Sequence, residues 1–596
     1  MTTTTFKAAA VQFEPTLGDK ARNIQALAER VAVAAAAGAS LIVTPEMGAT
    51  GYCWFDRSEV EPFVEPVPGP TTARFTEIAH QHGCYIVIGM PEVDMESGLY
   101  YNTAVLIGPE GVVGHHRKSH PYIAEPKWAA SGDRGHVVYD TPIGRIGLLI
   151  CMDIHFVETA RLLALESVDV ICHISNWLGE RTPAPYWISR AVENGCYLIE
   201  ANRYGLERTV QFSGGSCIIE PDGNVAACVD GGDGICYGVI DTARSRSREV
   251  FGETVFAQRR PEAYKYLANN TYAWNPSAFF QLYGHRPAPR GRRSVVSAVQ
   301  MQPTDDVEVN VKRVMQFART AKVRDDAMLV VFPELCLSGL RHPADRALEV
   351  TGLAVAQLRR FCLKQGLWLV VGMAEIADGR FYNTALVLGP GGIVGRHRKM
   401  HLSEADRAWA TAGDDWTVCD YPGGRMGVLV GHDATFPEAG RILALLGADV
   451  IACPALQRAP FVGAHAGSSV GQDHPIPTGA DPVHWHFYRT RAGENNVYLA
   501  FANSFDGDAG GHSGIFGPDT FVFPREEALI VAGDGVASLT IDTTSLPGSL
   551  YPTNVVRRKD LVLMRLPHHY KALVMNSTTS PLFNYRSLLK SQDSYA

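Results

Sequence analysis

The chain contains one long pattern twice, and this duplication limits what it can fold into. Residues 141–158 read TPIGRIGLLICMDIHFVE and residues 421–438 read YPGGRMGVLVGHDATFPE, and the two segments align without a gap. Three further segments recur in the same order. PEMGATGY is repeated as PELCLSGL, YNTAVLIGPEGVVGHHRK as YNTALVLGPGGIVGRHRK, and SRAVENGCYLIEAN as TRAGENNVYLAFAN. A period of about 280 residues is far too long for a solenoid unit, so each copy should be a domain with its own core.

The boundary between the copies is expected in GHRPAPRGRR (284–293), which is rich in Pro, Gly and Arg. This stretch precedes VVSAVQMQP, which repeats the AAAVQFEP of residues 8–15. We therefore expect one domain over residues 1–285 and a second over residues 293–596.

The composition excludes several classes of protein. The net charge is −8 and there is no long basic run, so the sequence does not indicate a nucleic-acid partner. No apolar stretch approaches the ~20 residues of a membrane span, and MTTTTFK lacks the pattern of a secretory signal. The twelve cysteines are scattered without a CxxC pair, as is typical of reduced thiols in a cytosolic protein. We expect a cytoplasmic protein without a membrane partner.

Short apolar runs alternate with helical patterns along the first half. The patterns of residues 19–38 and 156–167 predict helices. Strands are predicted for seven apolar runs: AAAVQF, SLIVTP, YIVIGM, NTAVLIG, RIGLLIC, DVICHIS and YLIEAN. Alternating strands and helices favour an α/β fold with helices packed outside the sheets. Periodicity alone does not separate an open sheet from an α-β-β-α sandwich.

A candidate nucleophile stands at the end of one of these strands. Cys151 follows the apolar run GRIGLLI and precedes a helical pattern, and a nucleophile on such a turn is exposed at the edge of a sheet. A thiol needs a base or a positive charge nearby, and Glu46 and Lys118 lie at the ends of other predicted strands. A lone Cys in a strand is usually a core residue, so the three residues matter only in combination.

In combination, these motifs resemble the nitrilase (carbon–nitrogen hydrolase) superfamily. The resemblance rests on P-E at a strand end, R-K-x-H, and C-x-D-x-x-F-x-E, in this order, and it covers both halves. It implies two tandem α-β-β-α sandwich domains. It also implies that Glu46 is the general base, that Lys118 stabilises the tetrahedral intermediate and that Cys151 is the nucleophile. Glu125 matches the second glutamate that the family often carries, which would position the substrate.

The resemblance implies a thiol amidohydrolase that opens a non-peptide C–N bond through a thioester, without cofactor or metal. Met152 and Asp153 follow the cysteine where nitrilases usually have Trp-Glu, which favours the amidase and carbamoylase branches; an N-carbamoyl amine hydrolase or a nitrilase is the alternative. Asn176 and Trp177 resemble a substrate-contacting segment of amidases, and Tyr52 and Met152 are further candidates for the pocket. Trp177 is equally compatible with packing at a sheet edge.

The second half lacks the nucleophile. Gly431 stands in place of Cys151 and Asp406 in place of Glu125, whereas Glu334 and Lys399 are retained. We therefore expect one catalytic and one degenerate domain that form a pseudo-dimer within the chain, with further homo-oligomers left open. A binding or regulatory protein without turnover is the alternative from another class. The small-molecule substrate is not identified by the sequence.

Overall fold

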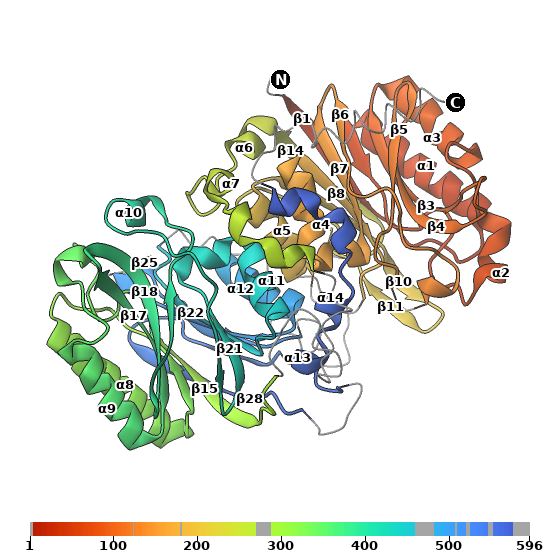
Figure 1. Ribbon diagram of the computed structural model, residues 1–596. Helices are drawn as coiled ribbons and strands as arrows, with labels where there is room; N and C mark the ends of the chain where they lie inside the picture. Colours follow the sequence, from red (N-terminus) through yellow and green to blue (C-terminus); the bar gives the residue numbers. More distant parts are fainter. Residues whose placement is uncertain are drawn as a thin grey trace.

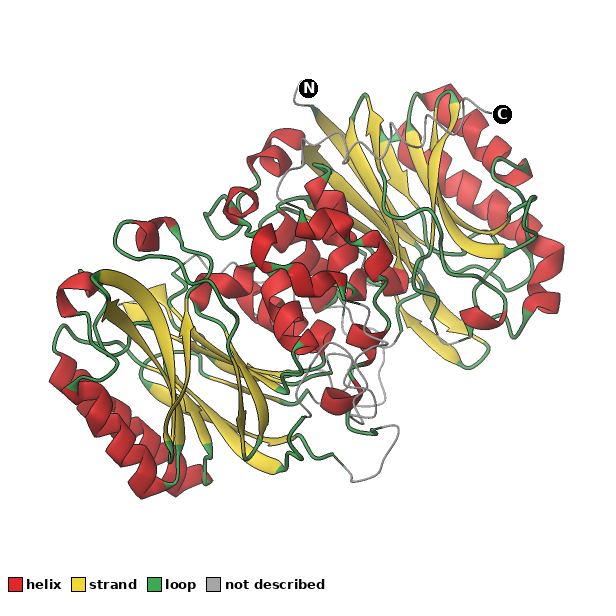
Figure 2. Ribbon diagram, in the orientation of Figure 1, coloured by secondary structure: helices red, strands yellow, loops and turns green. Residues whose placement is uncertain are grey.

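A computed structural model describes residues 4–122, 124–178, 182–229, 231–269, 288–458, 482–506, 509–519, 525–545 and 552–575. Within these ranges each half forms two six-stranded sheets, and helices lie outside them (Figure 2). Residues 284–287 of the expected linker lie outside the described residues. The same holds for 459–481, most of the segment by which the second half is longer.

The first sheet of the first half has the strand order β14-β1-β2-β3-β4-β5. Its strands are β1 (Thr5–Gln12), β2 (Leu41–Val43), β3 (Tyr85–Val93), β4 (Tyr100–Gly108), β5 (Gly111–Arg117) and β14 (Gly234–Asp241). Helices α1 (Lys20–Ala36) and α3 (Pro70–His82) cover its outer face. In β1, Ala9 and Val11 pack under these helices, whereas Ala8 and Ala10 face the second sheet. Both faces of the strand are buried, which explains its nearly continuous apolar sequence.

The second sheet has the order β13-β12-β9-β8-β7-β6. Its strands are β6 (Val138–Thr141), β7 (Gly144–Ile150), β8 (Val170–Ser175), β9 (Tyr197–Asn202), β12 (Cys217–Ile219) and β13 (Val225–Cys228). Helices α4 (Val157–Leu165) and α5 (Pro185–Asn194) cover it. Strands β7, β8 and β9 are parallel, so their carboxyl ends meet at one edge, where Cys151 begins the short helix η3 (Cys151–His155).

The second half repeats this order of strands, which confirms the predicted tandem α-β-β-α sandwiches. Its first sheet consists of β28 (Gly535–Asp542), β15 (Arg293–Gln300), β16 (Leu329–Val331), β17 (Trp368–Ala377), β18 (Arg380–Gly389) and β19 (Gly392–Arg398). The second consists of β20 (Val418–Tyr421), β21 (Gly424–Val428), β22 (Val450–Ala455), β23 (Tyr498–Asn503), β26 (Gly514–Phe516) and β27 (Glu527–Leu529). The covering helices are α8 (Val307–Asp325), α9 (Leu353–Gln365), α11 (Pro437–Leu445) and α12 (Val483–Asn495).

The predicted elements agree with the observed ones apart from their ends. The first helix ends at Ala36, two residues before the predicted Gly38, and Asp19 caps its other end by accepting a hydrogen bond from the backbone N–H of Arg22. The helix predicted over residues 156–167 is α4, for which Phe156 is the cap. Helix ends depend on local caps, which a periodicity does not resolve.

The two halves meet through helices α4 and α5 of one and α11 and α12 of the other, in the middle of the molecule (Figure 1). Arg190 Nη2 lies 2.7 Å from Glu494 Oε2, and Arg491 binds Glu193 in the same way across the contact. Since Arg190 aligns with Arg491 and Glu193 with Glu494, each half presents the same patch to the other. This is the self-complementary contact of a two-fold dimer, formed within one chain.

Each half also extends a tail over the other. The first tail contains α7 (Val255–Gln258), η4 (Pro261–Ala263) and η5 (Lys265–Ala268), and the second contains α14 (Asp560–Leu563), η10 (Pro567–His569) and η11 (Lys571–Val574). Arg259 Nε donates to Glu438 Oε1 at 2.9 Å, and Arg565 Nε donates to Glu158 Oε1 at 2.7 Å. The exchange of tails joins the two cores, and the largest apolar cluster contains residues of both halves.

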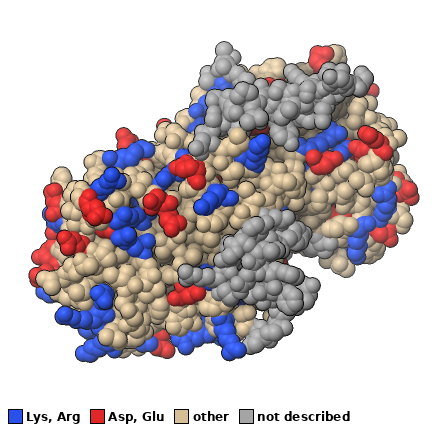
Figure 3. Space-filling view, viewed as in Figure 1, with Lys and Arg blue, Asp and Glu red and all other residues tan. Residues whose placement is uncertain are grey.

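The surface and the cysteines agree with the composition. Side chains of both signs are interspersed on the face in Figure 3. No disulfide joins any of the twelve cysteines, all of which the structure describes. Among the described residues, no helix has the length and apolar character that crossing a membrane requires.

Removal of Glu494 should destabilise the protein. Two buried arginines, Arg190 and Arg491, would then share the single carboxylate of Glu193. A buried ion-pair network that loses one partner typically loses about 3–5 kcal/mol of unfolding free energy, because a charge stays buried without compensation. Glu494→Ala should therefore lower the midpoint of denaturant unfolding. Glu77→Ala removes the partner of an exposed pair with Arg74 and should leave the midpoint nearly unchanged; equal midpoints for both variants would contradict this assignment.

Candidate active site

Three chain segments bring the predicted catalytic residues to one buried place. Glu46 follows β2, Lys118 follows β5 directly, and Cys151 follows β7. Glu125 begins the short helix η2 (Glu125–Lys127). The exposed fractions are 0% for Glu46, 1% for Lys118, 1% for Glu125 and 6% for Cys151. Charged groups are rarely buried so completely without partners, so their contacts define the site.

Lys118 holds the two carboxylates together. Its Nζ donates to Glu46 Oε1 at 2.7 Å and to Glu125 Oε2 at 2.6 Å. Asn102, on β4, was not singled out from the sequence; its Nδ2 donates to Glu46 Oε1 at 2.7 Å and to Glu125 Oε1 at 2.5 Å. The recurrence of YNTA in both halves was the signal that could have found it. Tyr52 Oη donates to Glu125 Oε2 at 3.2 Å. Glu125 is thus fixed by three side chains.

Burial changes the pKa values of both Glu46 and Cys151. Burial raises the pKa of Glu46 more than the charge of Lys118 lowers it. Burial, and then the charge of Glu46, raise the pKa of the Cys151 thiol well above its usual range, although Lys118 and the backbone N–H of Asn176 act against them. Cys151 therefore rests as a thiol, and its activation requires a base. Glu46 Oε2 is buried and has no hydrogen-bond partner among the described residues, so it can accept a proton.

The backbone at Cys151 is unusual for a residue with a side chain. Its φ is +42°, in the left-handed region, which costs of order 1–3 kcal/mol for such residues. The turn is fixed by Asp153, which accepts hydrogen bonds from Ile150 N at 3.2 Å and from Ser119 N at 3.1 Å. Strained residues of this kind concentrate at functional sites. Here the left-handed turn places the thiol of Cys151 at the end of a strand.

Two of the three histidines of HHRKSH contact the carboxylate that fixes this turn. His116 Nε2 and His120 Nδ1 lie 2.9 Å and 3.2 Å from the two oxygens of Asp153. Burial raises the pKa of Asp153, but these hydrogen bonds outweigh burial and hold it well below its usual range. Among the described residues, no three His, Cys, Asp or Glu side chains are grouped as metal ligands.

The predicted substrate contacts take different places. Asn176 Nδ2 donates to the backbone oxygen of Glu46 at 3.1 Å. Met152 is 8% exposed and packs in a small cluster with Tyr122, Phe156 and Leu561. The ring of Trp177 stacks on His155 with centroids 4.9 Å apart and is 2% exposed, as for a core residue. Contact of these residues with substrate stays a prediction.

The second half preserves the charged residues around an absent thiol. Lys399 Nζ lies 2.7 Å from Glu334 Oε1 and 2.6 Å from Asp406 Oδ2, and Asn383 Nδ2 donates to both carboxylates. Gly431 has a φ of +43°, almost that of Cys151. A Cβ at Gly431 would lie only 2.1 Å from Glu334 Oε2. The carboxylate of Glu334 therefore occupies the space that the Cβ of a cysteine at position 431 would need.

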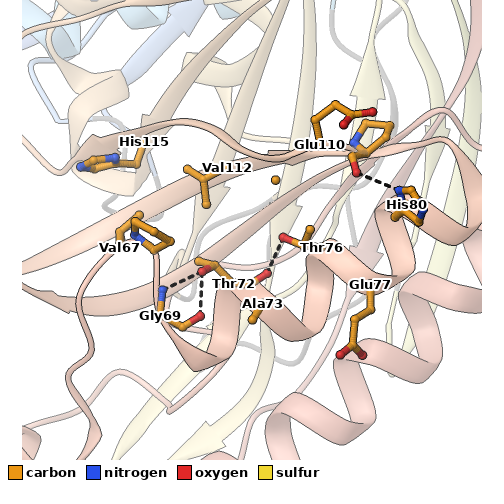
Figure 4. A pocket seen from close by; sticks show the side chains of 13 residues that line it. Val67, Gly69, Thr72, Ala73, Thr76, Glu77, His80, Glu110, Val112 and His115 are labelled. Carbon is orange, nitrogen blue, oxygen red and sulfur yellow. Dashed lines mark hydrogen bonds between the residues drawn. The ribbon is translucent and has the colours of Figure 1, made fainter.

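A separate groove of about 900 Å³ lies between α3 and the turn that joins β4 to β5 (Figure 4). Thr72 Oγ1 donates to Gly69 O and Thr76 Oγ1 to Thr72 O, both at 2.8 Å, and His80 Nδ1 lies 3.3 Å from Pro109 O. These side chains bond to nearby backbone, and no predicted catalytic residue lines the groove. We assign it no part in catalysis.

Comparison with known proteins agrees with this geometry. A sequence model described as carbon–nitrogen hydrolase matches residues 7–249 and again residues 295–532. The chain belongs to the carbon–nitrogen hydrolase family. It is accordingly a hydrolase of non-peptide C–N bonds, as predicted from the motifs.

Individual relatives match one half of this carbon–nitrogen hydrolase. The "Nitrilase" of Pyrococcus abyssi is 34% identical over 261 residues, which are 43% of this chain and 98% of the relative. The human "Omega-amidase NIT2" is 27% identical over 277 residues, 44% of this chain and 97% of the relative. A solved structure, Nit3 of Saccharomyces cerevisiae, a member of branch 10 of the nitrilase superfamily, is 24% identical with a TM-score of 0.38, covering 41% of this chain and 93% of its own. One such relative spans somewhat less than half of the chain.

Removal of the Asn102 amide should shift the pH dependence of activity. Its hydrogen bond to Glu46 lowers the pKa of that carboxyl, so Asn102→Ala should raise the pKa further. A base must be ionised, so kcat/KM should begin to fall at a higher pH on the acidic side. Asn383→Ala makes the equivalent change in the second half and should leave the profile in place. The assignment of Glu46 as base would be wrong if the profile of an active Asn102→Ala enzyme did not move.

Proposed function

We propose that the first half hydrolyses a small amide through a thioester on Cys151. The observation that carries the proposal is the free, buried Oε2 of Glu46, on a carboxylate held by Lys118 and Asn102 beside a thiol on a strained turn. An amide is favoured because relatives are named omega-amidase, deaminated glutathione amidase and (R)-stereoselective amidase. Met152 and Asp153, in place of Trp-Glu, favour the same branch.

In the first step, Glu46 takes the thiol proton while Sγ attacks the amide carbon. The carbonyl π electrons move onto oxygen, and the Lys118 ammonium stabilises the resulting oxyanion. Burial lowers the pKa of Lys118, but the charges of Glu125 and Glu46 outweigh burial and raise it, which keeps the side chain charged. Glu46 then returns its proton to the leaving nitrogen, the C–N bond breaks, and ammonia or an amine departs from the thioester.

In the second step, Glu46 removes a proton from water, which attacks the thioester carbon. The tetrahedral intermediate collapses with cleavage of the C–S bond, the thiolate regains its proton from Glu46, and the acid is released. Glu125, fixed between Lys118, Asn102 and Tyr52, orients the ammonium and the substrate. Every group in this cycle is supplied by the chain and by water, so the proposal includes no metal or cofactor.

The second half acts as a built-in partner in this proposal. Leu561, on its tail, packs against Met152, which follows the nucleophile. A short connection raises the effective concentration of the partner to roughly the millimolar range. We propose residues 1–285 as the catalytic domain and residues 293–596 as the degenerate one. A cytoplasmic location, the lack of a nucleic-acid partner and any further homo-oligomer belong to the proposal in the same way.

A nitrile substrate is the second candidate, and the naming of the Pyrococcus abyssi relative favours it. Attack of the same thiol on a nitrile carbon would give a thioimidate. One water would convert the thioimidate to the thioester with release of ammonia, and a second water would release the acid. Ammonia release from a panel of aliphatic, aromatic and amino-acid amides, N-carbamoyl amines and nitriles separates the candidates. A dominant response to an amide supports the proposal, and a dominant response to a nitrile replaces it.

Substitutions at the site should abolish hydrolysis without unfolding the protein. Cys151→Ala should retain less than a few per cent of the rate, because no other group forms the covalent bond. Glu46→Gln should slow turnover by about 10²–10⁴-fold, the usual contribution of an acid–base group. Glu334→Gln makes the same change beside Gly431 and should leave the rate unchanged. Substantial activity of Cys151→Ala, with the melting temperature unchanged, would disprove the mechanism.

A further inference from the structure

A chain of buried polar groups lies directly behind the nucleophile. His173 Nε2 lies 3.1 Å from the backbone oxygen of Cys151, and His173 Nδ1 forms a short hydrogen bond with Glu200 Oε2. Ser175 forms a short hydrogen bond with the other oxygen of Glu200 and lies 3.0 Å from Asn202 Oδ1. His173, Ser175 and Glu200 are all 0% exposed. The reaction cycle uses none of these three side chains.

The partners of His173 determine which of its nitrogens carries a proton. A backbone carbonyl can only accept, so Nε2 must carry the hydrogen that it donates to Cys151. Glu200 and Nδ1 then share one further proton, and the pair is neutral overall wherever that proton lies. Burial lowers the pKa of His173, but the charge of Glu200 outweighs it and raises the pKa, which also favours a protonated ring.

The second half shows how the same fold is built without these groups. In β8 and β9, His173 is the register partner of Glu200; in β22 and β23, Cys453 is the register partner of Phe501. Ala455 replaces Ser175. Phe501 stacks on Tyr488 with ring centroids 3.9 Å apart, so an apolar contact fills the same place. Sheet pairing therefore does not require the polar groups.

The polar groups occur in the half that has a cysteine at the turn. Gly431 adopts its φ of +43° easily, because it has no Cβ. Cys151 adopts nearly the same angle against the preference of a residue with a side chain, and its carbonyl receives the hydrogen bond from His173. A buried polar group is costly unless it is satisfied, so three such groups in one half indicate a function beyond packing.

We propose that His173, held by Glu200 and Ser175, is a positioning residue that anchors the carbonyl of Cys151 and so aims its thiol at Glu46. The inference rests on the proposed function only in taking Cys151 as the nucleophile. The hydrogen bond fixes the peptide after Cys151, and with it the left-handed turn. The thiol then stays within reach of the free Glu46 Oε2.

Alkylation of Cys151 by iodoacetamide tests the anchor without any substrate. The rate is followed by mass spectrometry of the peptide that contains Cys151. His173→Phe removes the N–H and should slow alkylation by about 10–100-fold, as expected for a misplaced nucleophile. His173→Gln, whose amide N–H can reach the same carbonyl, should recover part of the rate. Glu200→Gln should keep it, because its amide can donate to Nδ1 while Nε2–H stays on the Cys151 carbonyl.

A triple variant controls for folding. His173→Cys, Ser175→Ala and Glu200→Phe together install the residues that the second half already uses. This variant should melt near the wild-type temperature and react as slowly as His173→Phe. On the amide identified by the panel, both slow variants should lose kcat with KM unchanged, since positioning acts on the chemical step.

The outcomes separate the two proposals. Wild-type alkylation rates in both His173→Phe and the triple variant would overturn the anchor. A collapse of the melting temperature in both, shared by Glu200→Gln, would assign the three groups to folding and also overturn it. Failure of the wild-type enzyme to release ammonia from any amide would instead refute the proposed function, because the relative alkylation rates do not depend on turnover.

Discussion

The candidate active site depends on one buried lysine that pairs with two carboxylates. Lys118 is 1% exposed and contacts Glu46 and Glu125 at 2.7 Å and 2.6 Å. A charge in such surroundings is costly unless it is closely paired. The ends of β2 and β5, which carry Glu46 and Lys118, and the helix η2, which begins at Glu125, must therefore be placed together. In the part of the chain that the structure describes, this constraint leaves the other oxygen of Glu46 without a hydrogen-bond partner, beside the end of the strand that carries Cys151. The requirement to compensate a buried charge thus also positions the carboxylate that we propose as the base.

The second half retains the charged group of a lysine and two carboxylates but has no cysteine beside it. Glu334, Lys399 and Asp406 keep the same contacts in the second half, although Gly431 offers no nucleophile. Loss of a cysteine leaves no charge unpaired, whereas loss of the lysine would leave two carboxylates buried. The arginine–glutamate contacts between α5 and α12 impose a similar restraint at the interface. The second half can therefore lose its catalytic residue and remain a partner.

The strands and the motif residues could be predicted from the sequence, whereas contacts between residues far apart in the chain could not. Periodic apolar runs located the strands, and the resemblance implied Glu46, Lys118, Glu125 and Cys151, which the structure brings to one site. Asn102 was missed because a short polar residue inside an apolar strand gives no periodic signal, although its repetition in both halves was visible. The contact of Leu561 with Met152 joins residues about 400 positions apart and follows only from the exchange of tails. Hydrogen bonds between neighbouring parallel strands, such as that of His173 with Glu200, require the register.

The central claim is that each chain contains one acyl-forming cysteine, in its first half. The most direct measurement is rapid quenching of the enzyme during turnover of its amide, followed by mass spectrometry of the intact chain and its peptides. The account predicts at most one acyl group per chain, on the peptide that contains Cys151, for the wild type and for Gly431→Cys alike. Glu334 Oε2 would lie 2.1 Å from the new Cβ and would have to move, and Asp406 stands in place of Glu125, so no second competent site is expected. Two acyl groups per chain, or an acyl group on any residue between 293 and 596 of the wild type, would contradict it.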